Sequence, residues 1–275
     1  MNAGISINDA LTPLLEMMQS NHDSGKKLGL LSGIVELDSS LYGLGAGEMV
    51  VLAGRPGMGH GDLALRIAMN IAHGITFRNT SVQSAAPILH LSTKNKPFET
   101  TLKMMSLYCD LAPHHLLSGH LTDDHWQVVS NFVGLVYRLP ITLQTVDCMQ
   151  PESLLEVANE FINSKELVSG LIIIETIDHP TADFFKVIKK LSMQKQVPIL
   201  VIVDLDHCLE QRSDNAPRLG DLPLNGLIEQ FADVIMLFYR EVYYSPSDKN
   251  NSFFVNIAKS PFGPIRPFTI PANFQ

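Results

Sequence analysis

The most regular feature of the sequence is a series of apolar runs that alternate with stretches of helical period. The apolar runs occupy residues 48–53, 87–92, 140–145, 171–175 and 199–203, and the helical stretches include 63–73, 152–163 and 181–194. Continuous apolar strands that alternate with helices are typical of a parallel sheet with both faces covered. The pattern therefore predicts an α/β fold with a mostly parallel, twisted sheet and helices on both faces.

Two further apolar runs, 234–239 and 253–258, lie near the C-terminus. They are separated by residues 245–250, which are rich in serine, proline, aspartate and asparagine, the residue types that favour turns. We therefore expect a C-terminal β-hairpin that extends the sheet.

The first residues form a short amphipathic pattern of their own. Its apolar positions fall on one stripe of a helix at Ile7, Leu11, Leu14, Leu15 and Met18. Pro13 is expected in the first turn of this helix, and the polar residues 21–27 are expected to form a linker. The sequence thus predicts an arm at residues 1–27 and one domain at 28–275. The stripe must pack either on its own domain or on a neighbouring molecule, because so short a helix is marginal alone.

Composition excludes several classes of protein. The net charge of −8 argues against a surface that condenses on nucleic acid, so any DNA contact should be local and weak. The three cysteines and the histidines lack the spacing of a disulfide framework or a metal site, and we expect no bound metal. No apolar run approaches the ~20 residues of a membrane span. A cytoplasmic protein is expected.

A glycine-rich segment between the first apolar run and the following helix carries the clearest chemical pattern. It has the spacing GxxxxGK[ST] of a phosphate-binding loop and consists of Gly54, Arg55, Pro56, Gly57, Met58, Gly59, His60 and Gly61. In such a loop a lysine neutralises phosphate charge and a hydroxyl ligates Mg²⁺. Here His60 and Gly61 stand at those two positions, and Asp62 adds a negative charge. We expect no required cofactor and no Mg²⁺ binding, while weak ATP or phosphate binding through the backbone amides stays open.

The chain resembles the C-terminal motor domain of DnaB-type replicative helicases. The resemblance rests on residues 54–59, 121–126, 210–214, 226–233, 239–244 and 258–259. It implies a RecA-like P-loop fold, preceded only by the linker-helix arm and without the family's N-terminal domain. It also implies self-association, because the family's linker helix docks on the adjacent motor domain and joins subunits into a ring.

The same resemblance marks further positions at which this chain departs from the family. Lys94 stands where the family has the glutamate that polarises the attacking water, and Glu175 replaces a Mg²⁺-associated aspartate. Asp204 replaces the sensor glutamine, and Pro261 replaces the arginine that reaches the neighbour's γ-phosphate. Lys259, the lysine that makes the companion trans contact in the family, is retained. The resemblance therefore implies a degenerate ATPase site.

Three functions remain open on this basis. The first is a non-catalytic scaffold or modulator linked to DNA replication, which forms a homo-oligomer or associates with a replicative helicase. The second is a residual ATPase or helicase in which Lys94 or Lys259 supplies the missing charge. The third is a nucleotide-independent single-stranded DNA-binding module, for which Lys186, Lys189 and Lys190 form the notable basic cluster.

Overall fold

The fold is built around one large sheet. The computed structural model describes residues 6–24, 29–77, 80–146, 151–165, 169–175, 180–212, 214–224, 226–244, 252–263 and 265–271. Eight strands follow the order β10-β9-β8-β1-β7-β6-β4-β5. Their bounds are β1 Met49–Gly54, β4 Ile88–Ser92, β5 Ile141–Thr145, β6 Leu171–Glu175, β7 Ile199–Asp204, β8 Val234–Tyr239, β9 Ser252–Lys259 and β10 Phe268–Pro271.

The pairing of the strands confirms the predicted sheet. β1 lies between β7 and β8 and is parallel to both, and β5, β4, β6 and β7 continue the parallel arrangement. β9 is antiparallel to β8, which is the expected C-terminal extension, and β10 adds an antiparallel edge strand that the sequence did not predict. The expected turn at 245–250 lies outside the described residues.

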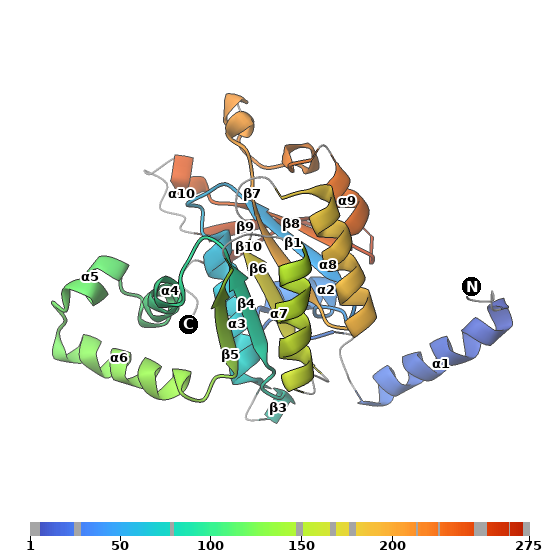
Figure 1. Cartoon of the computed structure of the whole chain (residues 1–275), viewed down its shortest axis with the longest axis horizontal. Helices are drawn as coiled ribbons and strands as arrows, with labels where there is room; N and C mark the ends of the chain where they lie inside the picture. The colour runs from blue at the N-terminus through green and yellow to red at the C-terminus, as the bar shows by residue number, and fades with distance from the viewer. Residues whose placement is uncertain are drawn as a thin grey trace.

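Helices cover both faces of the sheet (Figure 1). The helices α2 (Val35–Leu41) and α3 (His60–His73) pack on one face, and α7 (Pro151–Ser164), α8 (Ala182–Lys195) and α9 (Leu227–Phe231) pack on the other. Successive side chains of a strand point to opposite faces. Accordingly, Met49 and Val51 of β1 contribute to one buried cluster, and Val50 and Leu52 contribute to the other.

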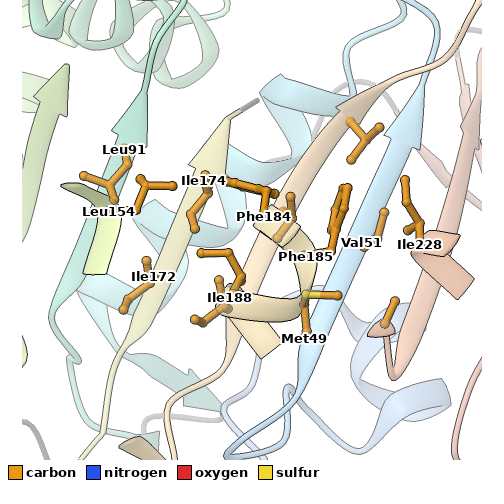
Figure 2. Close-up of a cluster of buried hydrophobic side chains, with 14 of the residues drawn as sticks. Met49, Val51, Leu91, Leu154, Ile172, Ile174, Phe184, Phe185, Ile188 and Ile228 are labelled. Carbon is orange, nitrogen blue, oxygen red and sulfur yellow. The ribbon is translucent and has the colours of Figure 1, made fainter. Parts of the chain in front are cut away.

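The centre of the α8 face is apolar and contains two aromatic rings. Figure 2 shows Phe184 and Phe185 of α8 among the aliphatic side chains of the strands, including Val51 and Ile174. The two phenylalanine rings meet edge to face at 5.2 Å between centroids, and Phe185 is 0% exposed. Burying one such side chain contributes about 1.5–3 kcal/mol, so this cluster anchors α8 to the sheet.

Three helices that the sequence analysis did not predict lie beside α3 and β5. These are α4 (Pro97–Cys109), α5 (Pro113–Ser118) and α6 (Asp123–Val136), which together project from the sheet in Figure 1. α4 and α6 pack beside α3 through a small cluster that includes Met69, Met104 and Phe132, and α5 contacts α4. The remaining short elements are β2 Ile75–Phe77, β3 Thr80–Gln83, the 3₁₀ turns η1 His207–Gln211 and η2 Leu219–Asp221, and α10 Glu241–Tyr244.

The N-terminal arm corrects two expectations. Its helix, α1, spans Ile7–Ser24, so Pro13 lies inside the helix and not in its first turn. The earlier start has a physical cause, since the Ser6 hydroxyl accepts a hydrogen bond from the Asp9 amide at 3.2 Å and donates one to the Asp9 carboxylate at 2.7 Å. The expected linker is also shorter, because the helix continues to Ser24 and only residues 25–27 of that segment lie outside the described residues.

The apolar stripe of α1 has no packing surface in the described part of the chain. The side chains of Ile7, Leu11, Leu14, Leu15 and Met18 are between 47% and 85% exposed. Figure 1 shows α1 standing apart from the sheet and its covering helices. Among the helices in the described ranges, none is both long enough and apolar enough to cross a membrane.

Candidate functional site

The glycine-rich loop joins β1, in the middle of the sheet, to the first turn of α3. Gly57 and Gly59 have φ angles of +83° and +99°, a backbone conformation that side chains disfavour, which explains glycine at both positions. The Leu63 amide donates to the Gly59 carbonyl at 3.0 Å, so α3 begins directly at the loop. The loop therefore lies where ligands bind in parallel sheets, at the carboxyl end of a strand and the N-terminus of a helix.

Arg55 fastens the loop to the segment that follows β7. Its guanidinium donates to the Leu205 carbonyl at 2.9 Å and forms a salt bridge with Glu210 at 2.9 Å. Because these contacts use the Arg55 side chain, it is a structural clamp of the loop.

His60 is largely buried at the edge of the space beside the loop, and its ring is bonded within its own chain. Its side chain is 6% exposed, and its Nε2 lies 3.0 Å from Oδ1 of Asp204, the last residue of β7. The ring packs against Gly54, where an added Cβ would lie only 3.0 Å from Nδ1, and that nitrogen is buried without a partner within the described residues. The histidine that replaces the expected lysine is thus held by the strand next to the loop.

Lys94 reaches the same carboxylate from the end of β4. Its Nζ lies 3.2 Å from Oδ2 of Asp204, so His60 and Lys94 bind one oxygen each. Burial acts to raise the pKa of Asp204, but the hydrogen bonds and charges of His60 and Lys94 outweigh burial and hold this pKa below its usual range. Asp204 is therefore an ionised, doubly bonded carboxylate.

Glu175, at the end of β6, is held by a separate set of donors. The Ser92 hydroxyl donates to it at 2.7 Å, and the Asn95 side-chain amide donates to both of its oxygens at 2.8 and 2.9 Å. The Ser92 oxygen also accepts the backbone amides of Lys94 and Asn95, which shapes the turn after β4. Sequence reasoning missed Asn95, although its position three residues after Ser92 at a strand end is a typical turn position.

A hollow of about 250 Å³ opens between these groups and the loop. Its charged lining consists of Asp62, Lys94, Lys103, Glu175 and Asp204. Burial raises the pKa of Asp62, with the charge of Lys103 acting in the opposite direction. Lys103 comes from α4, and no signal in the sequence placed it here.

Two other predicted site residues lie elsewhere. The Lys259 ammonium donates to the backbone carbonyls of Glu229 and Ala232, both at 2.6 Å, in its own chain. These bonds use two of the three ammonium donors and hold the side chain against its own chain, and the trans contact stays a prediction. Pro261 lies in the exposed turn after β9 and does not line the hollow.

The proposed basic cluster of α8 is partly used by the fold. The Lys189 ammonium forms a salt bridge with Asp233 at 2.6 Å and donates to the Gly47 carbonyl at 3.1 Å. Lys186 and Lys190 are exposed on the same helix. The cluster that would contact a DNA backbone thus contains one lysine with a structural role.

One group of possible metal ligands occurs among the described residues. The ligand atoms of Asp206, His207 and Cys208 lie within 4.8 Å of one another, and all three residues are exposed. The hydrogen bond with Asp206 raises the pKa of the Cys208 thiol. The sequence analysis did not consider these three residues together.

A parallel sheet whose central strand leads through a glycine-rich loop into a helix defines an α/β protein of the P-loop class. The family described as the DnaB-like helicase C terminal domain matches residues 29–275, and this chain belongs to that family.

Relatives and solved structures agree with this assignment. The replicative DNA helicase DnaB of Rickettsia prowazekii (strain Madrid E) is 25% identical over 88% of this chain and 51% of its own length. The DnaB helicase of Geobacillus stearothermophilus is 24% identical over 94% of this chain and 58% of its own length. This chain thus spans about half the length of such relatives.

Two solved structures share the fold. An ATPase domain superposes with a TM-score of 0.83 at 21% identity and covers 97% of this chain and 95% of that one. A DnaB-like replicative helicase, studied for its interactions with primase, also gives a TM-score of 0.83, at 22% identity over 98% of this chain and 65% of that one. These likenesses confirm the predicted RecA-like fold.

Proposed function

We propose that this DnaB-like domain does not hydrolyse ATP and acts in DNA replication as a scaffold or modulator that associates with copies of itself or with a replicative helicase. The observation that carries the proposal is the contact between His60 and Asp204. The residue at the lysine position of the loop is buried and bonded to a carboxylate of its own chain at 3.0 Å. His60 is therefore already bonded within its own chain before a nucleotide could bind.

The other requirements of a Mg²⁺–triphosphate site are equally poorly met. Gly61 provides no hydroxyl for the metal, and Glu175 is already bonded by Ser92 and Asn95. Lys94 places a cation where a general base would be needed, and a cation cannot accept a proton from water. These residues do not fit a bound Mg²⁺–ATP, so we propose that no cofactor is required.

Self-association is supported by the arm and by a groove on the domain. The exposed apolar stripe of α1 calls for a partner surface, since most of the stability of a helix in a protein comes from packing of its apolar face. A groove of about 660 Å³ between α3, α4 and α6 offers one, and Met69, Leu107, Tyr108, Val128 and Leu135 provide its apolar lining. We propose that α1 of one copy occupies this groove of the next.

A residual ATPase is the second candidate, and one observation favours it. Lys94 and Lys103 both line the hollow beside the loop, so positive charge is present although the loop lysine is missing. ATP turnover by pure protein distinguishes the two functions. Steady turnover that is lost in the Glu175→Gln variant would refute the non-catalytic proposal, and we expect none above background. His60→Lys alone should not restore turnover, because Lys94 and Pro261 remain.

Assembly is tested by light-scattering mass of the protein alone and mixed with a DnaB-type helicase, with and without ATP. We expect a ring-sized or mixed species that does not depend on ATP. Leu11→Glu with Leu15→Glu should abolish it, because charges on the stripe oppose burial. Thr12→Glu, an exposed change away from the stripe, is the matched control. A monomer that ignores the helicase and assembles only with ATP would contradict the proposal.

A further inference from the structure

The phosphate-binding loop of this chain lies beside an anion that the chain itself supplies. Asp204 closes β7, the strand hydrogen-bonded to β1, so its carboxylate reaches the hollow at the foot of the loop. One oxygen lies 3.0 Å from His60 Nε2 and the other lies 3.2 Å from Lys94 Nζ. Two side-chain donors that face the loop are thus bound by the two oxygens of one carboxylate.

We propose that the Asp204 carboxylate is a built-in occupant of the phosphate position, which keeps oligophosphate anions out of the loop while the carboxylate is in place. This inference rests on the proposed non-catalytic function and gives a physical reason for it. A phosphate group entering the hollow would have to compete for His60 and Lys94 against a partner that is covalently part of the chain. It would also meet the negative charge of that partner.

Asp204 is distinguished from the other carboxylates of the hollow by its contacts. Glu175 is bonded to Ser92 and Asn95, which belong to the turn after β4 and not to the loop. Asp62 lies in the first turn of α3, where burial raises its pKa and the charge of Lys103 acts in the opposite direction. Asp204 alone among these three binds His60 and Lys94 together, and its lowered pKa agrees with a carboxylate that stays charged at neutral pH.

His60, Lys94 and Asp204 stabilise one another in this site. A carboxylate at position 204 without nearby donors would be buried at a cost, and His60 and Lys94 remove that cost. With its own anion bound, the loop does not need an external phosphate to satisfy the side chains around it. Removing the Asp204 charge should therefore free both donors for a phosphate group that enters the hollow.

The test is calorimetric titration of the full chain with inorganic pyrophosphate in the absence of divalent cations. Asp204→Asn keeps the shape of the side chain but removes its charge, and we expect this variant to bind pyrophosphate at least about tenfold more tightly than the wild type. Asp206→Asn removes the same charge from an exposed carboxylate two residues later and should change the affinity less than about twofold. Asp204→Ser is the second variant if Asp204→Asn does not fold.

Two results would overturn the inference. The first is pyrophosphate affinity that is unchanged in both Asp204 variants, and the second is an equal gain in Asp206→Asn, which would reduce the effect to net charge. Neither result bears on the non-catalytic proposal, which fails only if the wild type turns over ATP. A gain confined to the Asp204 variants supports the inference whether or not the domain forms a ring.

Discussion

Lys259 is expected to stabilise the fold of its own chain, and this role can be tested by substitution. Its ammonium donates to the carbonyls of Glu229 and Ala232, both at 2.6 Å, at the C-terminal end of α9. Carbonyls at a helix C-terminus carry partial negative charge and lack partners within the helix. Lys259 therefore caps α9 from the neighbouring strand β9, and removing the ammonium should destabilise the isolated chain.

The expected magnitude follows from these two contacts. A hydrogen bond from a charged donor contributes about 1.5–3 kcal/mol, and a cation at a helix C-terminus contributes about 0.3–1 kcal/mol. Lys259 is only partly buried, so water replaces part of what is lost in the variant. We expect Lys259→Met to lower the free energy of unfolding by about 2 kcal/mol.

The assay is urea unfolding at protein concentrations where light scattering gives a monomer. Lys190→Met is the matched control, because Lys190 is exposed on α8 and the same change there should stay within about 0.5 kcal/mol. If Lys259→Met were as mild as the control, the ammonium would contribute nothing to its own chain. The cap would then be refuted, and a role toward a neighbouring subunit would be favoured.

Two further predictions concern the core and the site. Phe185→Ala should lower the free energy of unfolding by about 3–5 kcal/mol, since the ring is fully buried. Met193→Ala, on the exposed side of α8, is the control and should change the free energy of unfolding little. Equal urea midpoints for the two variants would contradict the packing of α8. The folded-state pKa of Asp204 is lowered, so its contribution to stability is present above the unfolded pKa of about 3.9 and is lost as pH falls through the folded pKa. The stability difference between wild type and Asp204→Asn, followed by urea unfolding across pH, should therefore shrink below about pH 4, and a difference that grows there would exclude the ionised carboxylate.

The sheet could be predicted from the sequence because most of its strands are continuous runs of apolar residues. β6, for example, is the run Leu171–Glu175 with four buried residues in succession, and its predicted bounds are those of the structure. Helices α4 and α6 were missed for the opposite reason. Each buries only two residues, Thr100 and Met104 in α4 and Val129 and Phe132 in α6, so neither helix carries a large buried face, although the apolar residues of α6 do recur at helical spacing.

Within the site, the features formed by neighbouring residues could be predicted, and the contacts between distant residues could not. The glycine-rich loop was predictable because its glycine spacing and flanking elements lie within a few residues. The group formed by His60, Lys94 and Asp204 was not, because residues separated by 144 and 110 positions meet only through the order of β1, β7, β6 and β4. The arm was misread at Pro13 because the cap formed by Ser6 and Asp9 was not considered.

The departures from the family pattern are physically connected. The resemblance described above implies that His60, Lys94 and Asp204 each stand where the family has a different residue, and that each change removes one catalytic role. In the structure they are each other's partners, with His60 and Lys94 on the two oxygens of Asp204. Substitutions that arose without regard to one another would tend to leave a partly buried charge unpaired, which is costly, whereas each oxygen of this carboxylate has a partner. The arrangement therefore shows how these side chains can be paired without a bound nucleotide, which agrees with the proposed non-catalytic function.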